Sequence, residues 1–167
     1  SLAGSFDLES SELRLNSSYF LKVNGLTFEK ASAQYRGLSA MFEGTVTDFQ
    51  DPHLNIQGEL QADLEKISSS FSGKIQALKD IQAKGTLLGP FTLSGPWNQP
   101  LNWEIKLDAK APFISLKKTL KLSLAEMQIH MKEKALHIPS FQAKAYHGLV
   151  STTTTFYFSD KKTFFES

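Results

Sequence analysis

Histidine is the side chain in this sequence best suited to bind a metal or to transfer a proton near neutral pH. The four histidines are His53, His130, His137 and His147. Because strands can bring distant residues together, the last three are candidates for a metal cluster. Each of these three lies in or beside a stretch of alternating apolar and polar residues, near lysines and without an Asp-rich loop. We therefore interpret them as surface or strand-end residues and expect neither a metal site nor a cofactor.

The sequence contains none of the familiar motifs of other catalytic sites. The sequence has no nucleophile elbow, Walker loop, dinucleotide-binding glycine motif, zinc-protease motif or EF-hand loop. The absence of cysteine excludes disulfides, thiol catalysis, zinc ribbons and iron–sulfur clusters. Carboxylates such as Glu12, Glu59, Glu104 and Asp108 occur singly at polar positions, which solvated strand faces explain. The sequence therefore predicts a protein that is not an enzyme.

Composition limits the possible partners. With 41% hydrophobic and 21% charged residues among 167, the chain has enough apolar material to fold. Lysine plus arginine (18) nearly balances aspartate plus glutamate (17), and Arg14 and Arg36 are the only arginines. Nucleic-acid binding usually requires a basic excess and bidentate arginines, so we do not expect a nucleic-acid partner.

The ends of the sequence indicate a segment of something longer. Residues 1–5 lack the basic and apolar regions of a signal peptide, and the chain opens inside an expected strand at residues 5–9. No run of 18 apolar residues is present, so no transmembrane helix is expected within the chain. We interpret residues 1–167 as a single β segment of a larger protein.

The dominant hydrophobic period is two. Residues 54–62 and 102–109 alternate strictly between apolar or glycine and polar positions, and shorter stretches around residues 12–15, 120–124 and 127–131 do the same. This pattern predicts antiparallel strands with one buried and one solvated face. Apolar parity changes between Leu124 and Met127, which predicts a bulge or tight turn near residues 125–126.

Two further local signals concern turns and helices. Asn24-Gly25 predicts a hairpin turn with positive φ at both positions. A helical spacing of Leu60, Leu64, Ile67 and Phe71 predicts one or two short helices between about residues 63 and 80. The remaining strand breaks are expected at glycine and proline: Gly37, Gly44, Gly85, Gly89-Pro90, Gly95-Pro96, Pro112, Pro139 and Gly148.

Three stretches resemble the AsmA-like proteins of Gram-negative envelopes, a group that includes TamB and YhdP. Residues 52–64, PHLNIQGELQADL, are similar to the family's P-x-L-x-L-x-G-x-L-x-A-D-L strand and helix start. Residues 81–96, IQAKGTLLGPFTLSGP, resemble a G-x-L-x-L-x-G-P segment followed by P-x-x-W/F-x-I/L, matched by residues 100–105. Residues 136–150, LHIPSFQAKAYHGLV, look like a strand pair in which His147 replaces a usual glycine and Gly148 can supply positive φ.

The resemblance covers most of residues 52–158 and implies both a fold and a function. It implies a long antiparallel sheet curled into a taco-like or groove-like half-pipe that carries phospholipid between the inner and outer membranes. It also implies a periplasmic location and an anchor to the inner membrane in the full-length protein. The phospholipid acyl chains would lie on the apolar face, and the headgroup would stay in water.

The candidate lipid-contacting residues come from the two longest alternating strands. We expect six apolar side chains to lie on the concave side of the sheet: Leu54, Ile56, Leu60, Trp103, Ile105 and Leu107. The alternative is a periplasmic or secreted β-sandwich that serves in binding or adhesion and buries the same face under a second sheet. Alternation alone does not distinguish an open apolar face from a closed core.

The interpretation of the histidines predicts that the purified protein contains no stoichiometric zinc and has no metal-dependent hydrolase activity. Elemental analysis after extensive dialysis measures the first property. A tightly held metal that disappears when His130 or His147 is replaced by alanine would contradict this prediction.

Overall fold

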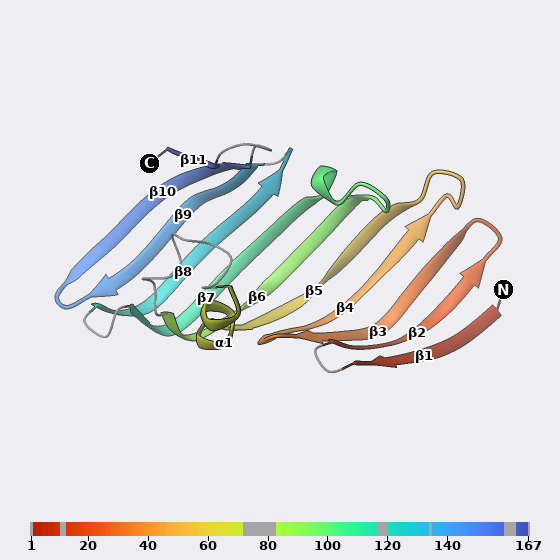
Figure 1. The fold of residues 1–167 in the computed structure, drawn as a ribbon, viewed down its shortest axis with the longest axis horizontal. Helices are drawn as coiled ribbons and strands as arrows, with labels where there is room; N and C mark the ends of the chain where they lie inside the picture. The colour runs from red at the N-terminus through yellow and green to blue at the C-terminus, as the bar shows by residue number, and fades with distance from the viewer. Residues whose placement is uncertain are drawn as a thin grey trace.

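The computed structural model describes residues 2–10, 13–71, 83–116, 120–133, 135–158 and 163–166. Strands dominate these residues, accompanied by one α-helix, α1 (Leu64–Phe71), and one 3₁₀ turn, η2 (Pro100–Asn102) (Figure 1). The strands are β1 (Leu2–Glu9), β2 (Leu13–Lys22), β3 (Gly25–Tyr35), β4 (Leu38–Thr47), β5 (His53–Asp63), β6 (Ala83–Pro96), β7 (Glu104–Leu116), β8 (Leu120–Lys132), β9 (Ala135–Ala145), β10 (Gly148–Phe158) and β11 (Thr163–Glu166).

All of the described strands belong to a single antiparallel sheet. Their spatial order is the order of the chain, from β1 to β11, so each strand pairs with its sequence neighbours. Figure 1 shows the result as a long twisted ribbon of strands with α1 at one end of the strands and η2 at the other. The prediction of a mostly β, antiparallel protein with a short helix is confirmed.

Alternation in β5 fixes the two faces of the sheet. His53, Asn55, Gln57, Glu59 and Gln61 are all exposed, whereas the side chains at even positions are buried or half-buried. The pairing of β4 with β5 and of β5 with β6 runs without a register shift. Residues directly opposite each other point to the same face, so this unbroken register carries the alternation of β5 into both neighbours.

Away from this central region, bulges interrupt the ladders. Register shifts lie between Phe28 and Ala31 on β3 and between Ser123 and Glu126 on β8. In β8, Leu124 has φ +50° and is 61% exposed, whereas Ala125 is 2% exposed. The predicted irregularity near residues 125–126 is therefore present. The extra residue turns the leucine outward and places the alanine on the inner position, which changes the parity of the strand.

Helix α1 occupies part of the region predicted to be helical. The Asp63 carboxylate oxygen Oδ1 accepts hydrogen bonds from the N–H groups of Glu65 (3.1 Å) and Lys66 (3.2 Å), as an N-cap does. The hydrogen bond from the Lys66 N–H is the main cause that lowers the pKa of Asp63. Leu64 packs against the buried apolar cluster of β7–β9. The rest of the predicted helical stretch, residues 72–80, lies outside the described residues.

Several turn predictions differ from the structure. The β2–β3 hairpin has Val23 and Asn24 as its central residues because Lys22 pairs with Gly25, and neither has positive φ. At the β9–β10 turn, positive φ occurs at Tyr146 and not at Gly148. Some expected breaks lie inside strands, namely Gly44, Gly85, Gly89-Pro90, Pro112 and Pro139. Gly44 pairs on both sides, with Phe28 and Ile56, whereas Pro112 and Pro139 fall between paired residues of their ladders, because proline has no N–H to donate.

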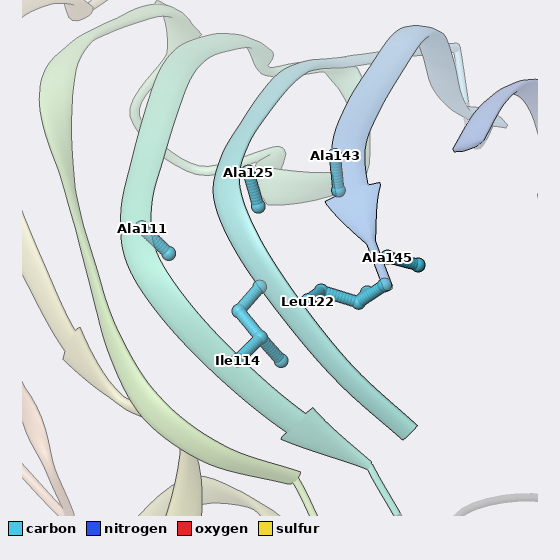
Figure 2. Packing of buried hydrophobic residues seen from close by; sticks show 6 residues of the cluster. All are labelled: Ala111, Ile114, Leu122, Ala125, Ala143 and Ala145. Carbon is cyan, nitrogen blue, oxygen red and sulfur yellow. The ribbon is translucent and has the colours of Figure 1, made fainter. Parts of the chain in front are cut away.

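The buried residues of this one-layer sheet are mostly small. Among the described residues, the side chains that are at most 2% exposed are Ala31, Ala109, Ala111, Ala125 and Ala143. Longer side chains on the same face shield an alanine from solvent, whereas a long side chain extends beyond its neighbours and stays more exposed. The main cluster lies beside the bent middle of β7 and β8 (Figure 2) and consists of Ala111, Ile114, Leu122, Ala125, Ala143 and Ala145.

Gly58 lies where strands β4 and β5 approach each other too closely for a side chain. A Cβ atom at this position would collide with the Met41 carbonyl oxygen and would lie 2.7 Å from the Cα atom of Phe42. We expect Gly58→Val to lower the free energy of unfolding by about 1–3 kcal/mol, because the β4–β5 ladder must open to admit the side chain. Glu59→Val, at an exposed position of the same strand, should change it by less than about 0.5 kcal/mol. Urea denaturation measures both, and equal losses would contradict the interpretation.

Candidate apolar binding face

Cross-strand register brings most of the sequence-predicted site residues onto one face. Ile56 of β5 pairs with Leu93 of β6, which in turn pairs with Ile105 of β7. Phe91 of β6 likewise pairs with Leu107 of β7. Leu54 and Leu60 have the same parity as Ile56 in β5 and so share its face.

The face continues well beyond β5 and β7. A row of residues that pair directly with one another crosses the sheet from β2 to β9. Gly44 is its only member without a side chain. Its other members are Tyr19, Phe28, Ile56, Leu93, Ile105, Met131 and Leu136. We call the side of the sheet that carries this row the apolar face. The row spans eight strands, or about 34 Å at the usual strand spacing.

The side chains of this row are only partly covered. All seven are half-buried, although each has apolar neighbours on the strands beside it. The described strands form one sheet, so no second sheet among them lies over the apolar face. Helix α1 contacts β5 and β6 and reaches the buried cluster through Leu64, at one end of the strands. The middle of the apolar face therefore has no covering layer within the part of the chain that the structure describes.

Trp103 is placed differently from the other five candidates. It follows η2 and precedes β7. Its Nε1–H donates to the Pro96 carbonyl oxygen (2.7 Å), and its ring packs over Gly95, where an added Cβ would lie 2.8 Å from Cδ1. Gly95 pairs with Leu54, so Trp103 lies at the margin of the apolar face next to Leu54. The absence of a side chain at Gly95 makes room for the indole ring.

The polar face of the sheet is not flat. Two shallow hollows involve β2–β6, and polar-face side chains line them, among them Glu29, Glu43, Asn55 and Gln57 around one and Glu59 and Gln61 around the other. Ile56 also lines the first hollow, and Leu60 also lines the second.

The structure brings two of the candidate metal-binding histidines together. His130 and His137 are direct cross-strand partners with ring centroids 6.2 Å apart. His147 lies in the turn at the opposite end of β9, and the His53 Nδ1 atom is 2.8 Å from the Asp51 carbonyl oxygen. Among the described residues, no group of three or more His, Cys, Asp or Glu side chains has an arrangement that could hold a metal ion.

The His130 ring belongs to an ionic network centred on Glu104. The Glu104 Oε1 atom is 3.1 Å from His130 Nε2 and 2.9 Å from Lys106 Nζ, and Oε2 is 3.8 Å from Lys132 Nζ. The hydrogen bond from Lys106, followed by that with His130, holds the pKa of Glu104 below its usual value. His137 Nδ1 lies 3.1 Å from the Thr155 hydroxyl oxygen and extends the network to β10. Glu104, Lys106, His130 and Lys132 thus pair with one another on the polar face.

Comparison of the chain with family models, with curated proteins and with solved structures gives no match. Within the described part of the chain, no helix has the length and apolar character needed to cross a membrane.

The network around Glu104 predicts a dependence of stability on acid. A carboxyl with a lowered pKa in the folded state stabilises the fold above its ordinary pKa of 4.5, and this contribution is lost as the pH falls through the folded pKa. Glu104→Gln should therefore reduce the loss of stability between about pH 6 and about pH 3. Urea midpoints measured across this range test the effect, with Glu59→Gln as the control. An unchanged pH profile for Glu104→Gln would contradict it.

Proposed function

We propose that this chain is a non-enzymatic segment of an AsmA-like envelope protein whose apolar face binds phospholipid acyl chains. The observation that carries the proposal is the row of half-buried apolar side chains that crosses eight strands with no covering layer among the described residues. Large exposed apolar surfaces on soluble proteins usually mark a site for an apolar partner.

The chemistry of the two faces suits this partner. Acyl chains need only a continuous apolar surface, and a row of separate aliphatic and aromatic side chains imposes no fixed binding position along it. The headgroup stays in water, so the site needs no dedicated phosphate-binding residues. The opposite face carries Asn55, Gln57, Glu59 and their neighbours, which are exposed and suit contact with the aqueous periplasm.

A curled, groove-like sheet is part of the proposal. Bulges strengthen the twist and bend of a strand, and the β8–β9 ladder contains two register shifts. The bent middle of β7 and β8 carries the alanine-rich cluster of Figure 2. We propose that the sheet curls most strongly there. In the full-length protein, such segments would link the inner and outer membranes, with an anchor in the inner membrane.

Charge insertion on the apolar face provides the test. Ile56→Lys and Ile105→Lys should weaken binding of a fluorescent C18 fatty acid at least about tenfold, because a buried ammonium has no partner beside an acyl chain. The fold should persist, because an uncovered face leaves the lysine access to water. Asn55→Lys adds the same charge on the opposite face of β5 and serves as the matched control.

Binding is measured by fluorescence titration, and circular dichroism with urea denaturation reports on the fold. A photo-crosslinking residue in place of Ile105 should yield adducts with co-purified phospholipid. If the wild-type chain binds no fatty acid, gives no lipid adducts, and unfolds on Ile105→Lys, the apolar face is a closed interior. That result would favour the β-sandwich binding module over the lipid-binding segment.

A further inference from the structure

A hollow of about 600 Å³ lies beside α1, where β1–β5 begin or end. Pockets for small ligands usually have volumes of about 300–1,000 Å³, so its size suits a small molecule. Arg14 of β2, Arg36 of the β3–β4 turn and Lys66 of α1 all line it. We call this hollow the arginine hollow, because both arginines of the sequence line it.

Cross-strand pairing builds the floor of the arginine hollow. Glu9 of β1 pairs with Arg14, which pairs with Gln34 of β3. Gln34 pairs with Ser39 of β4, which pairs with Gln61 of β5. Residues directly opposite each other point to the same face, so these five side chains form one continuous polar row. Its two amides and its hydroxyl offer both hydrogen-bond donors and acceptors to a ligand that lies across the row.

Gly37 allows α1 to approach the β3–β4 turn. Its φ is +90°, and an added Cβ atom would lie only 2.6 Å from the Cβ atom of Lys66. The Asp63 N–H donates to the Gly37 carbonyl oxygen (2.8 Å), which ties the turn to the residue that precedes the helix. The first turn of α1 therefore stands beside the β3–β4 turn and brings Lys66 to the same hollow as the arginines.

The two guanidinium groups are positioned in different ways. The Arg36 guanidinium carbon lies 5.4 Å from the centroid of the Tyr35 ring. Stacking of this kind uses the flat side of a guanidinium, whereas its N–H donors lie at its edge. The Arg14 Nη2 atom is 2.6 Å from Glu9 Oε1, and a guanidinium has five N–H donors. Arg14 can therefore hold an oxyanion in addition to the Glu9 carboxylate.

The charges of the lining residues favour a phosphate group. The cations are Arg14, Arg36 and Lys66, and the carboxylates are Glu9 and Asp63. Both carboxylates are already engaged, because Glu9 contacts Arg14, while Asp63 caps α1 and lies 3.6 Å from Lys66 Nζ. A phosphate monoester carries nearly two negative charges and three terminal oxygens, enough to engage two arginines at once. A carboxylate has one charge and two oxygens and matches this lining less well.

We propose that the arginine hollow binds the phosphate group of a small hydroxylated molecule of the glycerol phosphate class. Arg14 and Arg36 hold the phosphate oxygens, Lys66 adds positive charge, and the amides and hydroxyl of the floor bind the hydroxyl groups of the ligand. The phosphate is carried either by a free small molecule or by the phosphoglycerol headgroup of a lipid. This site uses residues other than those of the apolar face, so it does not depend on acyl-chain binding.

Isothermal titration calorimetry of the folded chain with glycerol phosphate, inorganic phosphate and glycerol tests the proposal. Glycerol phosphate should bind most tightly, and glycerol should not bind. Arg14→Gln and Arg36→Gln should each weaken binding of glycerol phosphate at least about tenfold, because each removes charge-assisted hydrogen bonds. Lys110→Gln is the matched control, because it removes another ion-paired cation, whose Nζ lies 3.2 Å from Glu126 Oε1 and outside the hollow. The control should bind as the wild type does.

Glu9→Gln distinguishes a phosphate site from an ion pair that only supports the fold. This substitution removes the carboxylate beside Arg14, so it should tighten phosphate binding, whereas Arg14→Gln should weaken it. An ion pair with a purely structural role would make both substitutions act in the same direction. Gln34→Ala should reduce the preference for glycerol phosphate over inorganic phosphate, because it removes a partner of the ligand hydroxyls. Circular dichroism and urea denaturation report on the fold of each variant.

Vesicle sedimentation separates the two sources of the phosphate. If the headgroup of a lipid supplies it, phosphatidylglycerol vesicles should bind the chain, soluble glycerol phosphate should compete, and Arg36→Gln should abolish the binding. If a free molecule supplies it, glycerol phosphate should bind and the vesicles should not bind through Arg36. The proposal is wrong if neither probe binds, if Lys110→Gln weakens binding as much as Arg14→Gln does, or if Glu9→Gln weakens it.

Ile56→Lys separates this site from the proposed function. It should abolish fatty-acid binding by the apolar face and leave the affinity for glycerol phosphate unchanged. Failure of the wild type to bind fatty acid would therefore contradict the proposed function alone. Loss of glycerol phosphate binding in a folded Ile56→Lys variant would contradict the assignment of the phosphate to the arginine hollow.

Discussion

The register between neighbouring strands is the constraint on which the whole sheet depends. Side chains alternate between faces with a period of two, so a slip of one residue would move every apolar side chain of a strand to the polar face. The β4–β5–β6 ladders run without a shift, and they align Ile56 with Leu93. Each further strand places its apolar side chains on the same face only because its register with the preceding strand is fixed.

Small residues and bulges follow from this constraint. Close pairing of β4 with β5 and of β6 with β7 leaves no room for a Cβ atom at Gly58 or Gly89. Where apolar parity fails along a strand, a bulge restores it, as in β8, where Leu124 turns outward and Ala125 takes the inner position. In this one-layer sheet, several alanines are almost completely buried, whereas the seven apolar side chains of the row from β2 to β9 stay half-buried.

The connections at the two ends of the strands differ in their local interactions. Helix α1 and its Asp63 cap close one end with hydrogen bonds and ion pairs. At the other end, the hydrogen-bonded connections hold Phe49 and Trp97 in water.

The sequence by itself determined the strands, the apolar parity of Leu54, Ile56, Leu60, Ile105 and Leu107, the short helix after residue 63 and the irregularity near residue 125. These features depend on residues close together in the chain, where a period of two or a helical spacing can be read directly. Only the tertiary structure decided that the strands follow one another in a single sheet, that β6 continues through Gly89-Pro90, that His130 faces His137, and that hydrogen bonds link the β2–β3, β4–β5 and β6–β7 connections. Each of these depends on which strand pairs with which and in what register, and this pairing arises from contacts between residues far apart in the sequence, which no local pattern specifies.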